Sequence, residues 1–239
     1  MSAPNAETEL DRFFSGLESY DHVWWKAKES LDVHLARAFS VFDYIQPDEN
    51  GLSRIIADLL DPGGKHGQGV TFLRAFLDML RDEGAAVRQD GEFDLSKSQI
   101  RCEAATTYIS HNLRRIDIRI ELSRVFGIGI ENKPWAGEQP DQLSDYHLEL
   151  KKRYGEDGFV LCYLCPQGKN PETLKPREKE ALESQGRFRI LHYSSHLRKW
   201  LDECIREVQA DKVRSFLKDF RVYLDRNFPS IPGEEAEKQ

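Results

Sequence analysis

The sequence lacks any long apolar run. Its 239 residues are 39% hydrophobic and 31% charged, and no apolar stretch approaches the roughly 20 residues that a membrane span requires. The first residues, MSAPNAETELDRFF, contain neither a basic start nor an apolar stretch, so we expect no secretory signal and no membrane association. These features predict a single soluble domain with a cytoplasmic location.

Cysteine is also scarce, with four residues in the chain. Cys162 and Cys165 form a CxxC pair, a spacing that occurs in metal and redox sites. However, the segment FVLCYLCP has the pattern of a strand, in which positions three apart point to opposite faces. No second CxxC and no HExxH completes a zinc site. We therefore expect buried, reduced thiols.

Positive charge is in deficit, because the formal net charge is −7. Non-specific coating of nucleic acid draws on many lysines and arginines, so this balance argues against that class of protein. The net charge is still compatible with a local basic groove. The carboxylates of a catalytic site would themselves make the net charge more negative.

Apolar periodicity predicts helices at both ends of the chain and strands alternating with helices between them. Spacings of three and four predict helices over residues 31–45, 49–62, 72–80, 140–155, 177–184, 196–208 and 212–228. Alternating or continuous apolar runs predict strands at 98–109, 115–123, 125–133, 159–166 and 187–194. We predict one α/β domain over residues 1–239, with a mixed sheet covered by helices on both faces. It divides into a core of about 48–195, an N-terminal helical extension 1–47, C-terminal helices 196–228 and a disordered tail 229–239.

The two central strands carry ionisable residues inside apolar runs. Asp117 and Glu131 each lie seven residues from Arg124, so an antiparallel hairpin turning there makes them cross-strand neighbours, about 5 Å apart at Cβ. Like charges directly opposite each other are destabilising, and a divalent cation such as Mg²⁺, which prefers oxygen ligands, compensates them. Lys133 lies two residues beyond Glu131, where its ammonium can balance the carboxylates or stabilise charge on a phosphate.

Other residues of this region have both a structural and a functional interpretation. Gly127 and Gly129 share the predicted face of Glu131, so we expect them to leave room for a ligand. For Trp135, core packing is favoured over stacking on a base. The structural alternative for Glu131 and Lys133 is an ordinary solvent-exposed ion pair. The flanking motifs favour the metal site over this alternative.

An Asp followed by Glu-x-Lys across a hairpin resembles the PD-(D/E)xK nuclease superfamily. The segments RIDI, IENK, GEQPDQLSDYH and ENGLSRIIADLLDP…HGQG resemble a bacterial family within it, over about residues 48–167. The resemblance implies a restriction-endonuclease-like core and Mg²⁺-dependent hydrolysis of nucleic acid, DNA rather than RNA, with Mn²⁺ as a substitute. The proline that often precedes the family aspartate is Ile116 here, a minor departure.

The same resemblance assigns roles to individual residues. Asp117 and Glu131 would be metal ligands, and Lys133 the catalytic lysine. The main-chain carbonyl of Asn132 would be a further ligand. Glu49 would add a carboxylate from an early helix, although an acid there also complements the helix dipole.

A glutamine and a tyrosine on the following helix extend the resemblance to RecB-like nucleases. Gln142 and Tyr146 are four residues apart and so share one helical face. The resemblance places them beside the metal, in catalytic and substrate-binding roles in which both donate to phosphate oxygens. The structural alternative is that Gln142 is an exposed amide and Tyr146 a half-buried tyrosine, both without a functional role. Arg115 is a further candidate for phosphate binding, with pairing to a neighbouring acid as the alternative.

Two further functions stay open on the sequence alone. The fold could serve as a catalytically inactive binding or interaction module, in phage defence or in a mobile element. No separate DNA-reading segment is recognisable. This is consistent with a homodimer, with a partner protein that supplies specificity, or with structure-selective cutting.

Overall fold

The computed structural model describes residues 6–36, 39–89, 91–109 and 113–231. The chain forms two compact units, Met1–Ile45 and Gln46–Gln239. The first contains the long helix α1 (Ala6–Leu35) and a short 3₁₀ helix, η1 (Val41–Asp43). The helix predicted over residues 31–45 is therefore wrong at Ala36 and over residues 39–45, whereas residues 37–38 lie outside the described residues. Ala36 has a φ of 42°, which a right-handed helix does not accommodate.

The second unit is built on a five-stranded mixed sheet. Its strands are β1 (Gln99–Ala105), β2 (Arg115–Ser123), β3 (Phe126–Asn132), β4 (Phe159–Cys165) and β5 (Phe188–His192), in the order β1-β2-β3-β4-β5. The first three strands pair antiparallel, whereas β4 joins β3 and β5 in parallel. Parallel neighbours need crossover connections, which the helices α4 (Gln142–Tyr154) and α5 (Pro176–Ser184) supply. The predicted α/β class is confirmed.

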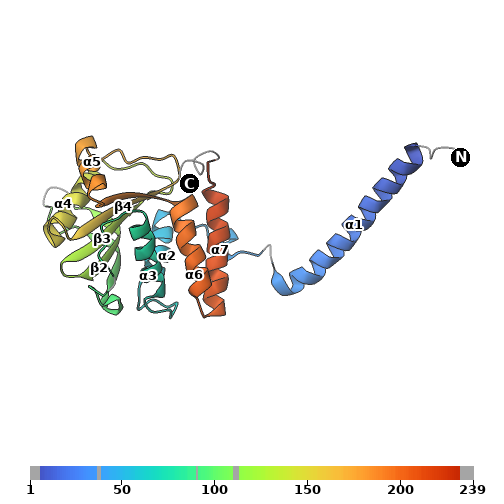
Figure 1. Cartoon of the computed structure of the whole chain (residues 1–239), viewed down its shortest axis with the longest axis horizontal. Helices are drawn as coiled ribbons and strands as arrows, with labels where there is room; N and C mark the ends of the chain where they lie inside the picture. Colours follow the sequence, from blue (N-terminus) through green and yellow to red (C-terminus); the bar gives the residue numbers. More distant parts are fainter. Residues whose placement is uncertain (1–5, 37–38, 90, 110–112, 232–239) are drawn as a thin grey trace. The chain divides into compact units, whose positions relative to one another are not determined.

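Helices cover both faces of this sheet (Figure 1). On one face lie α4 and α5, whose apolar side chains form a buried cluster with β4. On the other lie α2 (Glu49–Leu60), α3 (Thr71–Asp82), α6 (Arg198–Glu207) and α7 (Asp211–Asn227). The remaining described elements are the 3₁₀ helix η2 (Leu95–Lys97) and the π-helix η3 (Tyr193–Leu197). The last strand thus ends at His192, earlier than the apolar pattern predicts.

Local sequence signals fix the two helices that border the central hairpin. The side chain of Asp48 accepts a hydrogen bond from the main-chain N–H of Gly51 at 2.7 Å, so Asp48 is the N-cap of α2. At the end of α4, Gly155 takes a φ of 84°, the left-handed region that favours glycine. The first turns of α2 and α4 lie near the end of β3, where Asn132 bonds to Glu49 and Tyr146 bonds to Arg115 at the start of β2.

The glycines of β3 serve helix packing and leave no room for a ligand. A Cβ at Gly129 would lie 2.9 Å from Cδ1 of Leu150, and one at Gly127 would collide with the ring of Tyr154. Both of these larger side chains belong to α4. The expectation that Gly127 and Gly129 leave their face clear for a ligand is therefore wrong, because α4 packs directly on β3.

The described residues also test two simpler expectations. Cys162, Cys165 and Cys204 are buried free thiols, and Cys102 is a partly buried free thiol. Among the helices that the structure describes, none combines the length and apolar character needed to cross a bilayer. Of the predicted disordered tail, residues 232–239 lie outside the described part of the chain.

Candidate metal centre

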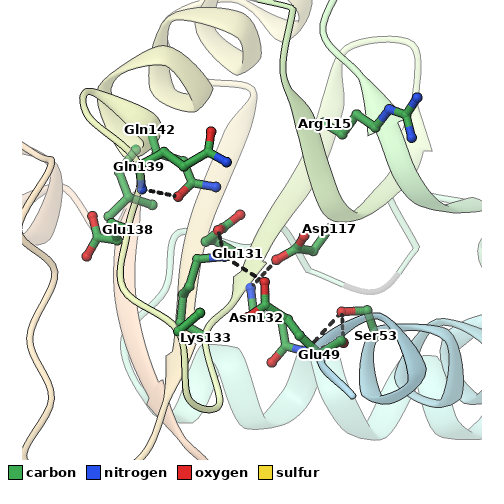
Figure 2. A network of polar contacts seen from close by, with 12 residues as sticks. Glu49, Ser53, Arg115, Asp117, Glu131, Asn132, Lys133, Glu138, Gln139 and Gln142 are labelled. Atoms are coloured by element: carbon green, nitrogen blue, oxygen red, sulfur yellow. Dashed lines mark hydrogen bonds and ion pairs between the residues drawn. The ribbon is translucent and has the colours of Figure 1, made fainter. Parts of the chain in front are cut away.

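The two acidic residues of the central hairpin meet at the ends of their strands. Ile118 pairs with Ile130 across β2 and β3, so Asp117 and Glu131 flank that pair on opposite strands. This is the register expected from their equal distance to Arg124. The main-chain N–H of Asn132 donates a hydrogen bond to Oδ2 of Asp117 at 2.7 Å, and Figure 2 shows the two carboxylates side by side.

Glu131 is the most buried ionisable group of this cluster. Its exposure is 0%, and neither carboxylate oxygen has a partner in hydrogen-bond geometry. The ammonium nitrogen of Lys133 lies 2.6 Å from Oε1 of Glu131 and 2.8 Å from Oε1 of Glu49. Lys133 therefore joins a carboxylate of β3 to one at the start of α2.

Burial and mutual repulsion shift the ionisation of these groups. Burial raises the pKa of Asp117 to about 6, although the hydrogen bond from Asn132 and the charge of Lys133 oppose it. Burial, together with the negative charge of Asp117, raises the pKa of Glu131 well above its usual range. Burial lowers the pKa of Lys133, but the charge of Glu131 and hydrogen bonds to Glu131 and Glu49 outweigh that effect, so the net shift is upward. The ammonium of Lys133 pairs with Glu131 and Glu49. A bound cation would therefore offset the remaining repulsion between the desolvated carboxylates of Asp117 and Glu131.

The donor set suits a hard divalent cation. Within the described residues, no group of three His, Cys, Asp and Glu side chains is arranged to hold a metal ion alone. Mg²⁺ commonly takes only one or two carboxylates and keeps several waters. Oε1 of Glu131 is ion-paired with Lys133, and its buried Oε2, which has no hydrogen-bond partner, is the atom that such an ion would satisfy. Asp117 and Glu131 thus fit the ion, whereas the carbonyl of Asn132 and the carboxylate of Glu49 stay predicted ligands.

The side chain of Asn132 has a structural role that the sequence reasoning missed. Its Nδ2 donates to Oγ of Ser53 at 2.9 Å and to the main-chain carbonyl of Glu49 at 3.2 Å. Its Oδ1 accepts a hydrogen bond from the hydroxyl of Tyr193. Asn132 therefore ties β3 to the first turn of α2 and so places Glu49 within reach of Lys133. No local pattern could reveal this, because Ser53 and Asn132 are 79 positions apart.

Gln142 and Tyr146 contact each other on α4, as their spacing predicts. Nε2 of Gln142 donates to the Tyr146 hydroxyl at 3.1 Å, and Oε1 of Gln142 accepts from the main-chain N–H of Gln139 at 3.1 Å. The Tyr146 hydroxyl in turn donates to the main-chain carbonyl of Arg115. Both side chains are buried, and burial together with the charge of Glu131 raises the pKa of Tyr146. They lie beside the carboxylates, and their contact with phosphate stays a prediction.

The two arginines at the start of β2 differ in their surroundings. The side chain of Arg115 is exposed, lies 3.7 Å from Glu103 and points away from the carboxylates in Figure 2. Arg114, which the sequence reasoning did not single out, forms an ion pair with Asp145 of α4 and donates to Oε1 of Gln139 at 3.1 Å. Arg114 thus connects the start of β2 with α4 and with the loop that contains Gln139.

Trp135 follows the lysine and is not a core residue. Its side chain is 53% exposed, so the expectation of core packing is wrong. Its ring lies 5.8 Å from that of Phe228, and Phe228 stacks on Tyr193 at 4.1 Å. Because Tyr193 also bonds to Asn132, the exposed indole is connected to the centre through a row of aromatic contacts.

Comparison with known proteins points to one family. A family model described as PD-(D/E)XK nuclease superfamily matches residues 39–221. This span includes the whole sheet and every residue of the candidate metal centre, and it excludes α1. Searches of curated proteins and of solved structures gave no match.

Proposed function

Because the chain belongs to the PD-(D/E)XK nuclease superfamily, we propose that it hydrolyses phosphodiester bonds of nucleic acid with a divalent cation as cofactor. We propose DNA as the substrate and Mg²⁺ as the cation, with Mn²⁺ as a substitute. The observation that supports this proposal best is the buried cluster of Asp117, Glu131 and Lys133. Oε1 of Glu131 is ion-paired with Lys133, and its buried Oε2 has no hydrogen-bond partner, so a cation could bind there in addition to the ion pair.

In this proposal the carboxylates of Asp117 and Glu131, with the main-chain carbonyl of Asn132, hold the metal. The bound ion supplies Lewis-acid polarisation of the phosphate and lowers the pKa of a coordinated water. The main-chain N–H of Asn132 orients Asp117 by holding its Oδ2. Glu49 serves as an additional ligand when its contact to Lys133 is released.

Lys133 provides positive charge next to the reacting phosphate. Its ammonium is anchored by Glu131 and Glu49, so it is held in place before substrate arrives. Preorganised donors of this kind stabilise charge that develops in a transition state. Lys133 is therefore proposed to stabilise the negative charge on the phosphate or to orient the attacking water.

Residues around the centre are proposed to position the nucleic acid strand. Gln142 and Tyr146 lie beside the carboxylates and are proposed to donate to phosphate oxygens when substrate binds. The exposed ring of Trp135 is suited to stack on a base, because every base has a π-face. Arg115 is exposed at the edge of the same strand as Asp117, where it is proposed to contact a more distant phosphate.

The test is a cleavage assay with a matched lysine control. Plasmid DNA, single-stranded DNA and RNA are incubated with the wild-type chain, Lys133→Ala or Lys97→Ala, in Mg²⁺, Mn²⁺ or EDTA. Lys97 is exposed and pairs only with Asp94 of its own turn in the described structure. We expect metal-dependent cleavage of DNA by the wild type and Lys97→Ala, and a loss on the order of 10²–10³ in Lys133→Ala.

Two results would change the assignment. Equal cleavage by Lys133→Ala and the wild type would show that the activity comes from elsewhere. Binding of DNA by the wild type without cleavage in either metal would favour the inactive binding or interaction module. A requirement for an added partner protein would appear as cleavage only in its presence.

A further inference from the structure

The helix α1 (Ala6–Leu35) carries an apolar seam with a seven-residue repeat. Its members alternate in spacing between three and four: Leu10, Phe13, Leu17, Tyr20, Trp24, Ala27 and Leu31. The large members with described side chains are exposed, from 44% for Leu31 to 70% for Tyr20. The family match begins at residue 39, so the seam is an addition to the nuclease-like unit.

The repeat indicates what covers the seam. A helix that packs on a globular body usually shows a broader apolar stripe with a period of 3.6 residues. A strict alternation of three and four keeps one narrow seam facing a partner helix in a left-handed coiled coil. We propose that this partner helix is α1 of a second copy of the chain, and that the two helices run antiparallel.

The charge distribution along α1 favours the antiparallel arrangement. Residues 6–21 contain five acidic residues and one arginine, a formal net charge of −4, whereas residues 22–35 contain two lysines and two acidic residues, a net charge of 0. A parallel pair would place the two acidic halves side by side, and like charges along a coiled coil oppose pairing. The antiparallel pair places each acidic half beside the neutral half of the other copy.

The seam residues also pair well in this direction. With the two-fold axis near residue 22, Phe13 faces Leu31 of the second copy, Leu17 faces Ala27, and Tyr20 faces Trp24. Six of the seven seam positions then lie opposite another seam position, whereas position 10 lies opposite His34. The larger Leu17 meets the smaller Ala27, an alternation that lets core layers interdigitate.

The exposed apolar surface is large enough for a stable dimer. Phe13, Leu17, Tyr20, Trp24 and Leu31 each expose roughly 100 Å² at these fractions, since fully buried aromatic side chains cover 150–250 Å². The flanking Phe14 and Val23 add to the same side. Two copies thus offer on the order of 1,000–1,500 Å², close to the 1,200–2,000 Å² of standard interfaces.

The first test measures the mass of the full chain in solution by light scattering after size-exclusion chromatography. We expect the wild type at about 100 μM to have the mass of two copies. Leu17→Glu/Tyr20→Glu places two acids in the seam and is expected to have the mass of one copy. The matched control Ser15→Glu/Ser19→Glu adds the same two acids outside the seam and is expected to remain a dimer. Circular dichroism and the melting temperature check that both variants keep the folded nuclease-like unit.

The second test determines the direction of the helices by oxidative crosslinking. A parallel pair brings two copies of Phe13→Cys together, whereas the antiparallel pair brings Phe13→Cys next to Leu31→Cys of the other copy. We expect a disulfide-linked dimer only when these two variants are mixed, with the wild type as the control for its native thiols. Crosslinking of Phe13→Cys alone would overturn the antiparallel arrangement. A monomeric wild type, or a dimer that survives Leu17→Glu/Tyr20→Glu, would overturn pairing through this seam.

Discussion

Replacing Asp117 by asparagine should stabilise the metal-free protein. Burial raises the pKa of Asp117 to about 6 from the usual value of 3.8. Because one pKa unit corresponds to about 1.36 kcal/mol, the ionised carboxylate costs up to about 3 kcal/mol of folding stability at neutral pH. Asparagine removes that charge and keeps an oxygen that can accept the hydrogen bond from the N–H of Asn132.

The effect has a defined dependence on pH. A carboxyl whose pKa is raised on folding binds its proton more tightly in the folded state than in the unfolded state. The free energy of unfolding therefore falls as pH rises from about 4, where the unfolded carboxyl ionises, to about 6, where the folded one does. The gain from Asp117→Asn should therefore be largest above pH 7 and small near pH 4. Divalent cation at 1,000 times the dissociation constant should reverse the ranking, because it stabilises the wild type by about 4.1 kcal/mol.

The assay is urea unfolding at several pH values, in EDTA and in excess Mg²⁺ or Mn²⁺. Asp58→Asn, at an exposed position of α2, is the matched control and should change stability little under any of these conditions. The reasoning fails if Asp117→Asn destabilises the metal-free chain at pH 7.5. It fails equally if cation stabilises Asp117→Asn as much as the wild type.

Three further predictions follow from the packing around the centre. Gly127→Ala should lower the free energy of unfolding by about 1–3 kcal/mol, because the new methyl group collides with Tyr154; Gly137→Ala, with open space around it, should be near neutral in the same urea titration. Asn132→Ala should cost about 2–3 kcal/mol, because it leaves buried hydrogen-bonding partners unsatisfied, and an unchanged urea midpoint would contradict the bridging role. Trp135→Ala should weaken binding of single-stranded DNA by about 1–3 kcal/mol in fluorescence anisotropy with Ca²⁺, whereas Trp135→Phe should retain most of the affinity; equal affinities of Trp135→Ala and the wild type would exclude stacking.

The hairpin that carries the centre could be predicted because its signals are local. Strict alternation of isoleucines fixed the two strands, and the equal distances of Asp117 and Glu131 from Arg124 fixed their register. Side-chain period and hairpin symmetry depend only on residues close in the sequence.

Features that depend on distant contacts could not be predicted. The sequence showed that Gly127 and Gly129 lack side chains, but not that α4 rather than a ligand fills the space above them. The link from Asn132 to Ser53 joins residues 79 positions apart, and the exposure of Trp135 depends on which elements pack around it. The apolar spacing over residues 31–45 continued past Leu35, but the backbone at Ala36 ended the helix.

The most direct measurement is a crystal structure of the protein soaked with Mn²⁺, read through the anomalous signal of the metal. We predict one peak between the strands β2 and β3, with oxygens of both Asp117 and Glu131 within about 2.0–2.3 Å of it. The peak should vanish in Glu131→Gln crystals soaked in the same way. No peak there in the wild type, or a peak held by other residues, would contradict the assignment of this cluster as the metal centre.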